Sequence, residues 1–179
     1  LDSKVLIDVL ASRQKFPKLI VISSTYTYSE PQNLSLDSVF KENNFLAENY
    51  EASLIDRPDV TYSNGKRAME SYFTKNYSSS KLIILRFPII LGIEDYTLRT
   101  QYYFNKIKFK EKINPENINN STNYIFSFEA AIAILNFIKH DHCGTYNVAL
   151  EPVSEKELIE LYCSHFNLNS EELLDQKIN

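Results

Sequence analysis

Hydrophobic positions follow two different patterns along this chain, a helical period and short continuous runs. The first 14 residues carry an apolar stripe with the period of a helix, formed by Leu1, Val5, Leu6, Val9 and Leu10. Residues 18–24 then form a β-branched run that ends in small hydroxyl residues, which is typical of a buried parallel strand. The pattern therefore predicts a helix followed by a strand whose carboxyl end is Ser24.

The same succession is repeated further along the chain. Residues 62–77 follow a helical pattern, and residues 81–87 form another apolar run, which Pro88 stops because proline cannot donate to a strand ladder. Strand, helix and strand in this order imply a right-handed parallel crossover. The predicted fold class is therefore α/β with a parallel sheet.

The remainder of the chain mixes weaker signals. Residues 30–59 are polar and irregular, with apolar positions spaced for one or two short helices, and residues 114–123 form a turn-rich loop. Further elements are expected as helices at 96–110 and 129–138 and strands at 124–126 and 144–149. Ser154 and Glu157 have the spacing of a capping box for a helix that reaches about residue 165, and Ser170 is expected to cap a last helix.

Composition limits the classes of function. The chain has 179 residues, of which 44% are hydrophobic, so it can bury a core of ordinary size. A net charge of −4 argues against a partner such as nucleic acid or an anionic membrane. The apolar run 82–93 is too short to span a bilayer. The four lysines at 106, 108, 110 and 112 are interpreted as a solvated helix face, the alternative being contact with a phosphorylated ligand.

The cysteines and histidines indicate neither a disulfide nor a metal site. Cys143 and Cys163 do not form a C-x-x-C pair and fit a reduced, cytoplasmic setting. His140, Asp141 and His142 precede Cys143 and resemble a metal cluster, but they are interpreted as a short polar loop because no second ligand group matches them.

Candidate chemistry centres on Tyr62 and Lys66, which share one helix face because they are four residues apart. A fixed positive charge favours the phenolate of a neighbouring tyrosine, so the pair could exchange a proton with a substrate hydroxyl. Two further Tyr–Lys pairs have the same spacing, at 77 and 81 and at 102 and 106. Ligands gather at the carboxyl ends of parallel strands, where Ser24 could donate a hydrogen bond to the same reacting oxygen.

Four segments together resemble the extended short-chain dehydrogenase/reductases, which include NAD-dependent sugar-nucleotide epimerases, dehydratases and reductases. They are the strand Val-Ile-Ser-Ser ending at Ser24, with Tyr28 four places on, and the Y-x-x-x-K-x-x-x-E pattern from Tyr62 to Glu70. The others are Leu-Arg-Phe-Pro at 85–88 with Gly92, and Gly-Thr-Tyr-Asn-Val-Ala at 144–149.

The resemblance implies a partial Rossmann-like sheet, the C-terminal half of a nucleotide-binding domain, in residues 1–95 and a small α/β substrate subdomain in residues 96–179. It also implies that Tyr62 is the general acid/base, that Lys66 binds the nicotinamide ribose and lowers the pKa of Tyr62, and that Ser24 hydrogen-bonds the reacting oxygen. The main chain at Pro88 and Ile89 would contact the nicotinamide of NAD or NADP. Glu70 and Glu129 are expected to be structural, the latter by placing negative charge at a helix N-terminus.

The chain departs from the family in three ways. It lacks the glycine-rich loop that holds the dinucleotide pyrophosphate, since its glycines are Gly65, Gly92 and Gly144 alone, so its own affinity for NAD or NADP is expected to be low. Ser24 and Tyr62 are 38 positions apart, which implies an insertion within residues 30–59. Thr25 and Tyr26 replace the Asp-Glu pair of the dehydratases, which disfavours dehydration and leaves reduction or epimerisation.

Two hypotheses follow for the function. The first is the catalytic and substrate-binding part of an NAD(P)-dependent epimerase or reductase that acts on a nucleotide sugar. The alternative is a non-catalytic remnant that serves as a binding or dimerisation module. In both cases the resemblance implies a homodimer through the helices that begin near Leu1 and Tyr62.

Overall fold

The computed structural model of the protein describes residues 2–28, 39–51, 60–93, 95–114 and 118–174. By contact, the chain divides into two compact units, Leu1–Pro88 with Ala133–Val148 and Ile89–Ile132 with Ala149–Asn179. The functional division into residues 1–95 and 96–179 stays a prediction.

The first unit is built on a three-stranded parallel sheet with the order β1-β2-β6. Its strands are β1 (Leu19–Ser24), β2 (Leu82–Phe87) and β6 (Gly144–Asn147). All six residues of β2 are buried, because this strand is paired on both edges and covered on both faces. The parallel sheet predicted from the two apolar runs is therefore confirmed.

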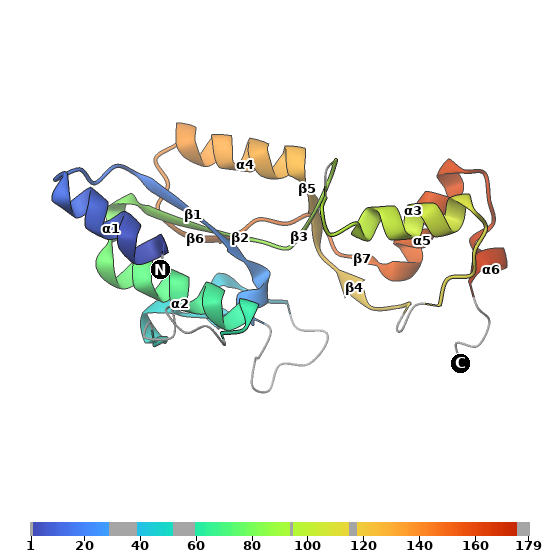
Figure 1. Cartoon of the computed structure of the whole chain (residues 1–179), viewed down its shortest axis with the longest axis horizontal. Coiled ribbons are helices and arrows are strands. Elements are labelled where there is room, and N and C mark those ends of the chain that lie inside the picture. The colour runs from blue at the N-terminus through green and yellow to red at the C-terminus, as the bar shows by residue number, and fades with distance from the viewer. Residues whose placement is uncertain (1, 29–38, 52–59, 94, 115–117, 175–179) are drawn as a thin grey trace. The chain divides into compact units, whose positions relative to one another are not determined.

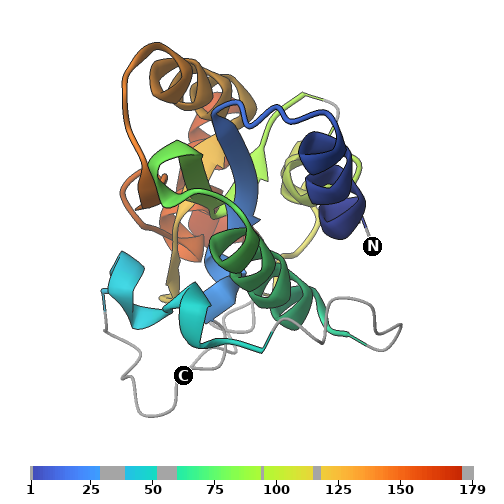
Figure 2. The same cartoon turned by 90° about the vertical axis from the view of Figure 1, so that its left-hand side faces the viewer.

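Helices lie on both faces of this sheet (Figure 1). α1 (Asp2–Ser12) and α2 (Tyr62–Asn76) lie on one face, and the second half of α4 (Ser127–Lys139) lies on the other. Figure 2 shows α1 and α2 beside β1 from a second direction. A core between the two helices and the sheet joins side chains of α1, β1, α2 and β2 and of the residue that follows α2: Ile7, Val21, Phe73, Tyr77, Leu82 and Ile84.

A buried ion pair lies between α2 and the sheet. Nη2 of Arg86 is 2.6 Å from Oε2 of Glu70, and their side chains are only 1% and 0% exposed. The hydroxyl of Ser23 also bonds Glu70, and Arg86 donates to the Tyr28 hydroxyl over 2.6 Å. Glu70 is thus a structural residue of the sheet-to-helix packing, as the sequence indicated.

The described middle of the 30–59 segment is tied to this ion pair. It forms two 3₁₀ turns, η2 (Glu42–Asn44) and η3 (Ala47–Asn49), rather than longer helices. Arg86 donates to the main-chain oxygens of Glu42 and Phe45, while the carboxylate of Glu42 accepts from the amide of Asn147. The remainder of the expected insertion, residues 30–38 and 52–59, lies outside the described residues.

Among its described residues, the second unit contains two short sheets, three complete helices and the first part of α4. β3 (Ile89–Leu91) pairs in parallel with β5 (Tyr124–Phe126), and β4 (Ser121–Thr122) pairs antiparallel with β7 (Val153–Ser154). The helices are α3 (Arg99–Lys108), α5 (Glu155–His165) and α6 (Ser170–Leu173). Their core consists of Ile107, Ile113, Ile159, Cys163 and Leu173.

Element ends in the second unit show which local signals were sufficient. The capping box of Ser154 and Glu157 is confirmed at the start of α5. The cap expected at Ser170 is wrong by one residue, because the side chain of Asn169 accepts from the amide of Glu171. The helix expected from residue 96 begins at Arg99, since Leu98 has a positive φ of 55°.

None of the helices in the described ranges combines the length and the apolar character needed to cross a bilayer.

Neutralising Glu70 should destabilise the first unit strongly. Glu70→Gln would leave the Arg86 charge buried without its partner, so we expect the free energy of unfolding to fall by about 3–5 kcal/mol. Urea denaturation followed by circular dichroism measures this change. Glu160→Gln is the matched control, because Glu160 pairs with Lys156 at the surface and should change stability by less than about 1 kcal/mol. Equal effects of the two changes would contradict the role given to Glu70.

Candidate active site

Ser24 ends β1, as the sequence predicted, and is 5% exposed. Its main-chain oxygen accepts from the hydroxyl of Thr27 over 3.0 Å, and its own Oγ accepts from the amide of Tyr26 over 3.2 Å. A serine hydroxyl can accept and donate at once, and the Ser24 hydroxyl donates to no group among the described residues, so its proton can be directed at a ligand.

Tyr62 is the first residue of α2, and the cap before it fixes where the helix begins. The side chain of Thr61 accepts from the amide of Asn64, so the helix starts with Tyr62. Tyr62 is 62% exposed, and its ring centroid lies 5.8 Å from that of Tyr26 in an edge-to-face arrangement. The structure thus connects Tyr62 to Ser24 through one intervening residue, Tyr26.

Lys66 lies one helical turn after Tyr62, on the same side of α2. Its Nζ is 5.7 Å from the centre of the Tyr62 ring and donates to the main-chain oxygen of Ile22 over 3.0 Å. Burial lowers the pKa of Lys66 below its ordinary value, and the carboxylate of Glu70 opposes that shift. The ammonium therefore bridges the end of β1 and the Tyr62 ring.

The two predicted cofactor contacts follow β2 in the chain. Pro88 comes directly after β2, at the same carboxyl edge of the sheet as Ser24, since Ser24 is in register with Phe87. Ile89 is the first residue of β3 and belongs to the second unit. Their contact with a nicotinamide stays a prediction.

The other two Tyr–Lys pairs have different surroundings. Tyr77 is a core residue whose hydroxyl donates to the main-chain oxygen of Pro17, and Lys81 donates to Phe16. Lys106 lies 5.5 Å from the ring of Tyr102, a geometry very similar to that of Lys66 and Tyr62. A four-residue spacing on a helix is therefore enough to bring a lysine near a tyrosine ring. Of the three pairs, only Tyr62 and Lys66 also lie near a strand end that carries a serine.

The histidine-rich loop makes structural contacts. The main-chain oxygen of His140 and the carboxylate of Asp141 both accept from Lys18, and Cys143 donates to the main-chain oxygen of Ser80. Within the part of the chain that the structure describes, no three or more His, Cys, Asp or Glu side chains are grouped as metal ligands.

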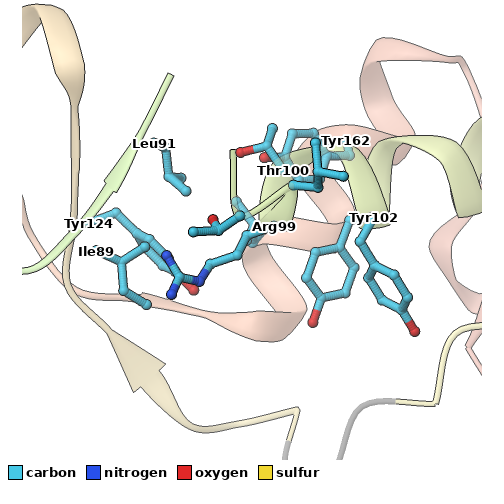
Figure 3. A pocket seen from close by; sticks show the side chains of 11 residues that line it. Ile89, Leu91, Arg99, Thr100, Tyr102, Tyr124 and Tyr162 are labelled. Atoms are coloured by element: carbon cyan, nitrogen blue, oxygen red, sulfur yellow. The ribbon is translucent and has the colours of Figure 1, made fainter. Parts of the chain in front are cut away.

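Sequence reasoning missed a pocket of about 470 Å³ in the second unit. It is lined by apolar residues of β3 together with tyrosines and one arginine, among them Ile89, Leu91, Arg99, Tyr102, Tyr124 and Tyr162. In Figure 3 the guanidinium of Arg99 extends toward Ile89 and Tyr124. The lining comes from four separate elements, so no local spacing could reveal it. The one local signal for a binding site was the pair Tyr102 and Tyr103 one helical turn after Arg99.

One hydrogen bond holds Tyr103, a further residue of the pocket lining. The hydroxyl of Tyr103 donates to the carboxylate of Glu155 at the start of α5. Burial and this carboxylate raise the pKa of Tyr103, so its phenol stays protonated and keeps donating at any physiological pH. The pocket thus offers aromatic faces and one cation.

The depressed pKa of Lys66 can be measured directly. After reductive ¹³C-methylation, the Lys66 resonance, assigned by its loss in Lys66→Arg, should titrate below 10.5, and Glu70→Gln should lower its pKa further. Between that pKa and 10.5 the unfolded chain binds more protons than the native one, so Lys66 makes stability rise with pH in this window. A Lys66 pKa at or above 10.5 would contradict the burial of its ammonium.

The comparisons with known proteins concern the fold alone. No protein-family model matches the chain, and no curated protein matches it. Among solved structures, dTDP-glucose 4,6-dehydratase from Bacillus anthracis, in complex with NAD, is 14% identical with a TM-score of 0.72, over 97% of this chain and 53% of that one.

Two further structures represent related activities. UDP-N-acetylglucosamine 4-epimerase from Methanobrevibacter ruminantium, in complex with UDP-N-acetylmuramic acid, is 20% identical with a TM-score of 0.69, over 96% of this chain and 53% of that one. dTDP-4-dehydrorhamnose reductase from Bacillus anthracis, in complex with NADP, is 18% identical with a TM-score of 0.60, over 88% and 50%.

The chain spans about half the length of the structures it matches. The matched part is their C-terminal half, as the motifs indicated. The resemblance to the extended short-chain dehydrogenase/reductases is therefore confirmed for the fold: this chain has the fold of the C-terminal half of sugar-nucleotide dehydratases, epimerases and reductases.

Proposed function

We propose that the chain is the catalytic and substrate-binding part of an NAD(P)-dependent epimerase or reductase that acts on a nucleotide sugar or a similar carbonyl/hydroxyl substrate. The observation that carries the proposal is the sequence of contacts at the end of β1. Ser24 is joined to Tyr62 through Tyr26, and Lys66 joins Tyr62 to Ile22. A hydroxyl, a phenol and an ammonium are therefore held at one strand end.

In this mechanism Ser24 donates a hydrogen bond to the reacting oxygen while Tyr62 gives or takes its proton. Lys66 places positive charge beside the phenol, which favours the phenolate when the substrate is a hydroxyl to be deprotonated. The partial burial of Lys66 strengthens its attraction for the phenolate, because two charges interact more strongly where water is excluded. The nicotinamide, when bound, supplies hydride transfer at the carbon that carries the reacting oxygen.

The residues present fit only one end of the cofactor. Lys66 and the main chain at Pro88 and Ile89 suit the nicotinamide and its ribose. No glycine cradle for a pyrophosphate accompanies them: Gly65 lies inside α2 against Val60, and Gly92 packs against Ser127. We therefore expect weak binding of NAD or NADP by this chain, since phosphates bind most strongly where the backbone can approach them.

The topology supports the view that further chain completes the site. Among the described strands, β1 pairs with β2 alone, so its other edge is unpaired. α1 precedes β1 and lies on the same face as α2 (Figure 1). Because parallel crossovers are right-handed, a strand leading into α1 would lie beside β1 on that unpaired edge. A preceding segment or another polypeptide could supply this strand.

The pocket of the second unit is the proposed place for the nucleotide of the substrate. Bases stack on aromatic faces, and a guanidinium pairs with phosphate oxygens in a two-pronged arrangement. Tyr102, Tyr124 and Tyr162 supply the first kind of surface and Arg99 the second. The epimerase noted above was solved with a UDP-linked sugar acid, which supports the same class of ligand.

A second candidate is a non-catalytic remnant that acts as a dimerisation module. The observation that favours it is the exposed apolar face of α1, where Val5, Leu6 and Val9 are 54%, 39% and 41% exposed. Such a face can pair with the same helix of a second copy. No fluorescence change with millimolar NADH or NADPH would favour the remnant over the enzyme. A dimeric mass by light scattering would support pairing through α1 in either case.

The acid/base role of Tyr62 predicts a large loss of turnover in Tyr62→Phe. With UDP- and dTDP-hexoses and saturating NAD or NADP, the rate of carbonyl reduction or epimerisation should fall by about 10²–10⁴-fold. Coupled absorbance and chromatography of the sugar nucleotides measure it. Tyr102→Phe is the control for the similar Tyr–Lys contact on α3 and should keep the rate of proton transfer. Full turnover in Tyr62→Phe would remove the proposed mechanism.

The proposed nucleotide pocket predicts weaker substrate binding without Arg99. Arg99→Gln should raise the dissociation constant of a UDP-sugar by about 10- to 100-fold, because a charge-assisted hydrogen bond to phosphate is lost. Isothermal titration calorimetry measures binding without requiring turnover. Lys110→Gln, which lies outside the pocket lining, serves as the control for simple loss of positive charge. Equal affinities of the Arg99→Gln and unchanged proteins would contradict this placement.

A further inference from the structure

Tyr26 is held in a rigid turn directly after β1. The turn is the 3₁₀ helix η1 (Thr25–Tyr28). Thr27 is fixed at both polar groups, since its hydroxyl donates to Ser24 and its main-chain oxygen accepts from Arg67 Nε over 2.8 Å. The Tyr28 hydroxyl bonds Arg86 and Asn147. The backbone on either side of Tyr26 is therefore anchored to α2 and to the sheet.

From this anchored turn, the Tyr26 side chain extends to the surface and meets Tyr62. The ring centroids are 5.8 Å apart and the ring planes make an angle of 83°, which is the favoured edge-to-face geometry. Tyr62 begins a helix and is mostly exposed, so few groups of the described residues can restrict its ring. Besides Tyr26, the Lys66 ammonium lies near the ring, at 5.7 Å.

The main chain of Tyr26 acts on the second member of the site. Its amide donates to Ser24 Oγ, which directs the remaining hydrogen of that hydroxyl away from the turn. One residue thus contacts both groups that the mechanism brings to the reacting oxygen.

We propose that Tyr26 is a positioning residue for the acid/base Tyr62: its ring, presented by the anchored η1 turn, confines the exposed phenol to the side of Ser24. The catalytic effect of this positioning rests on the proposed function of Tyr62. The contact between the Tyr26 and Tyr62 rings does not depend on any substrate. Fixing a reacting group in one orientation before the substrate arrives lowers the barrier, because the ordering is already present in the free protein.

The test is the rotamer distribution of Tyr62 in the free protein. In protein labelled with ¹³C-tyrosine, the Tyr62 ring and β-carbon signals are assigned by their loss in Tyr62→Phe. Tyr26→Leu removes the aromatic partner and keeps apolar bulk. We expect the ring-current shift of Tyr62 to disappear and its alternative rotamers to become about two- to tenfold more populated, as an edge-to-face pair is worth that factor.

Tyr26→Phe is the conservative variant, which keeps the ring and should retain the Tyr62 signals of the unchanged protein. Tyr102→Leu removes the similar edge-to-face partner of Tyr103 in the other unit and should leave Tyr62 unaffected. Unchanged Tyr62 signals in a folded Tyr26→Leu protein would overturn the proposal. If Tyr26→Leu fails to fold, loss of the ring-current shift in Tyr26→Phe, whose ring persists, would overturn it as well.

Turnover separates this proposal from the proposed function. If the chain is active, Tyr26→Leu should lower kcat by about two- to tenfold with little change in KM, and Tyr26→Phe should restore it. If the chain has no turnover but Tyr26→Leu loses the Tyr62 ring-current shift, the result would support the positioning contact and contradict the proposed enzymatic function. A raised KM with unchanged kcat in Tyr26→Leu would instead make Tyr26 a substrate contact and overturn the positioning role.

Discussion

The ion pair of Arg86 and Glu70 is the interaction on which the first unit depends. An arginine in a fully buried strand is costly unless every donor finds a partner. Here its donors reach the Glu70 carboxylate, the Tyr28 hydroxyl and the main chain of the 39–51 segment. One side chain therefore links the central strand, the helix that carries Tyr62, the turn after Ser24 and the described middle of the long polar segment.

This arrangement explains why the same Tyr–Lys spacing can point to a candidate site on one helix and not on another. The contacts of Lys106 with Tyr102 and of Lys66 with Tyr62 have nearly the same length. The second pair differs because α2 is fixed against β1 and β2 by the buried ion pair, which places its first turn at the end of β1. The chemistry proposed for Tyr62 therefore depends on the packing of α2 against the sheet, whereas the four-residue spacing reflects only the helix.

The sequence sufficed for those features that depend on local pattern or on strongly apolar runs. Strands β1, β2 and β6, helices α1 and α2, and the Ser154 cap follow from periodicity and cap chemistry. The short strands β3, β4 and β7 were missed: β3 follows the proline that ends the predicted strand, and the two residues of β4 and of β7 carry no period. The Ser170 cap was misplaced because Asn169 competes for the same role. The Tyr26 contact and the tyrosine pocket join residues that are far apart in sequence, which no spacing predicts.

None of the described strands pairs with the outer side of β1. A strand with an unpaired row of amides and carbonyls is a template for any extended segment that can approach it. Within the described residues, the strand carries isoleucine and valine and no charged side chain that would repel a visitor. If no further strand covers this row, self-association through β1 competes with the folded monomer.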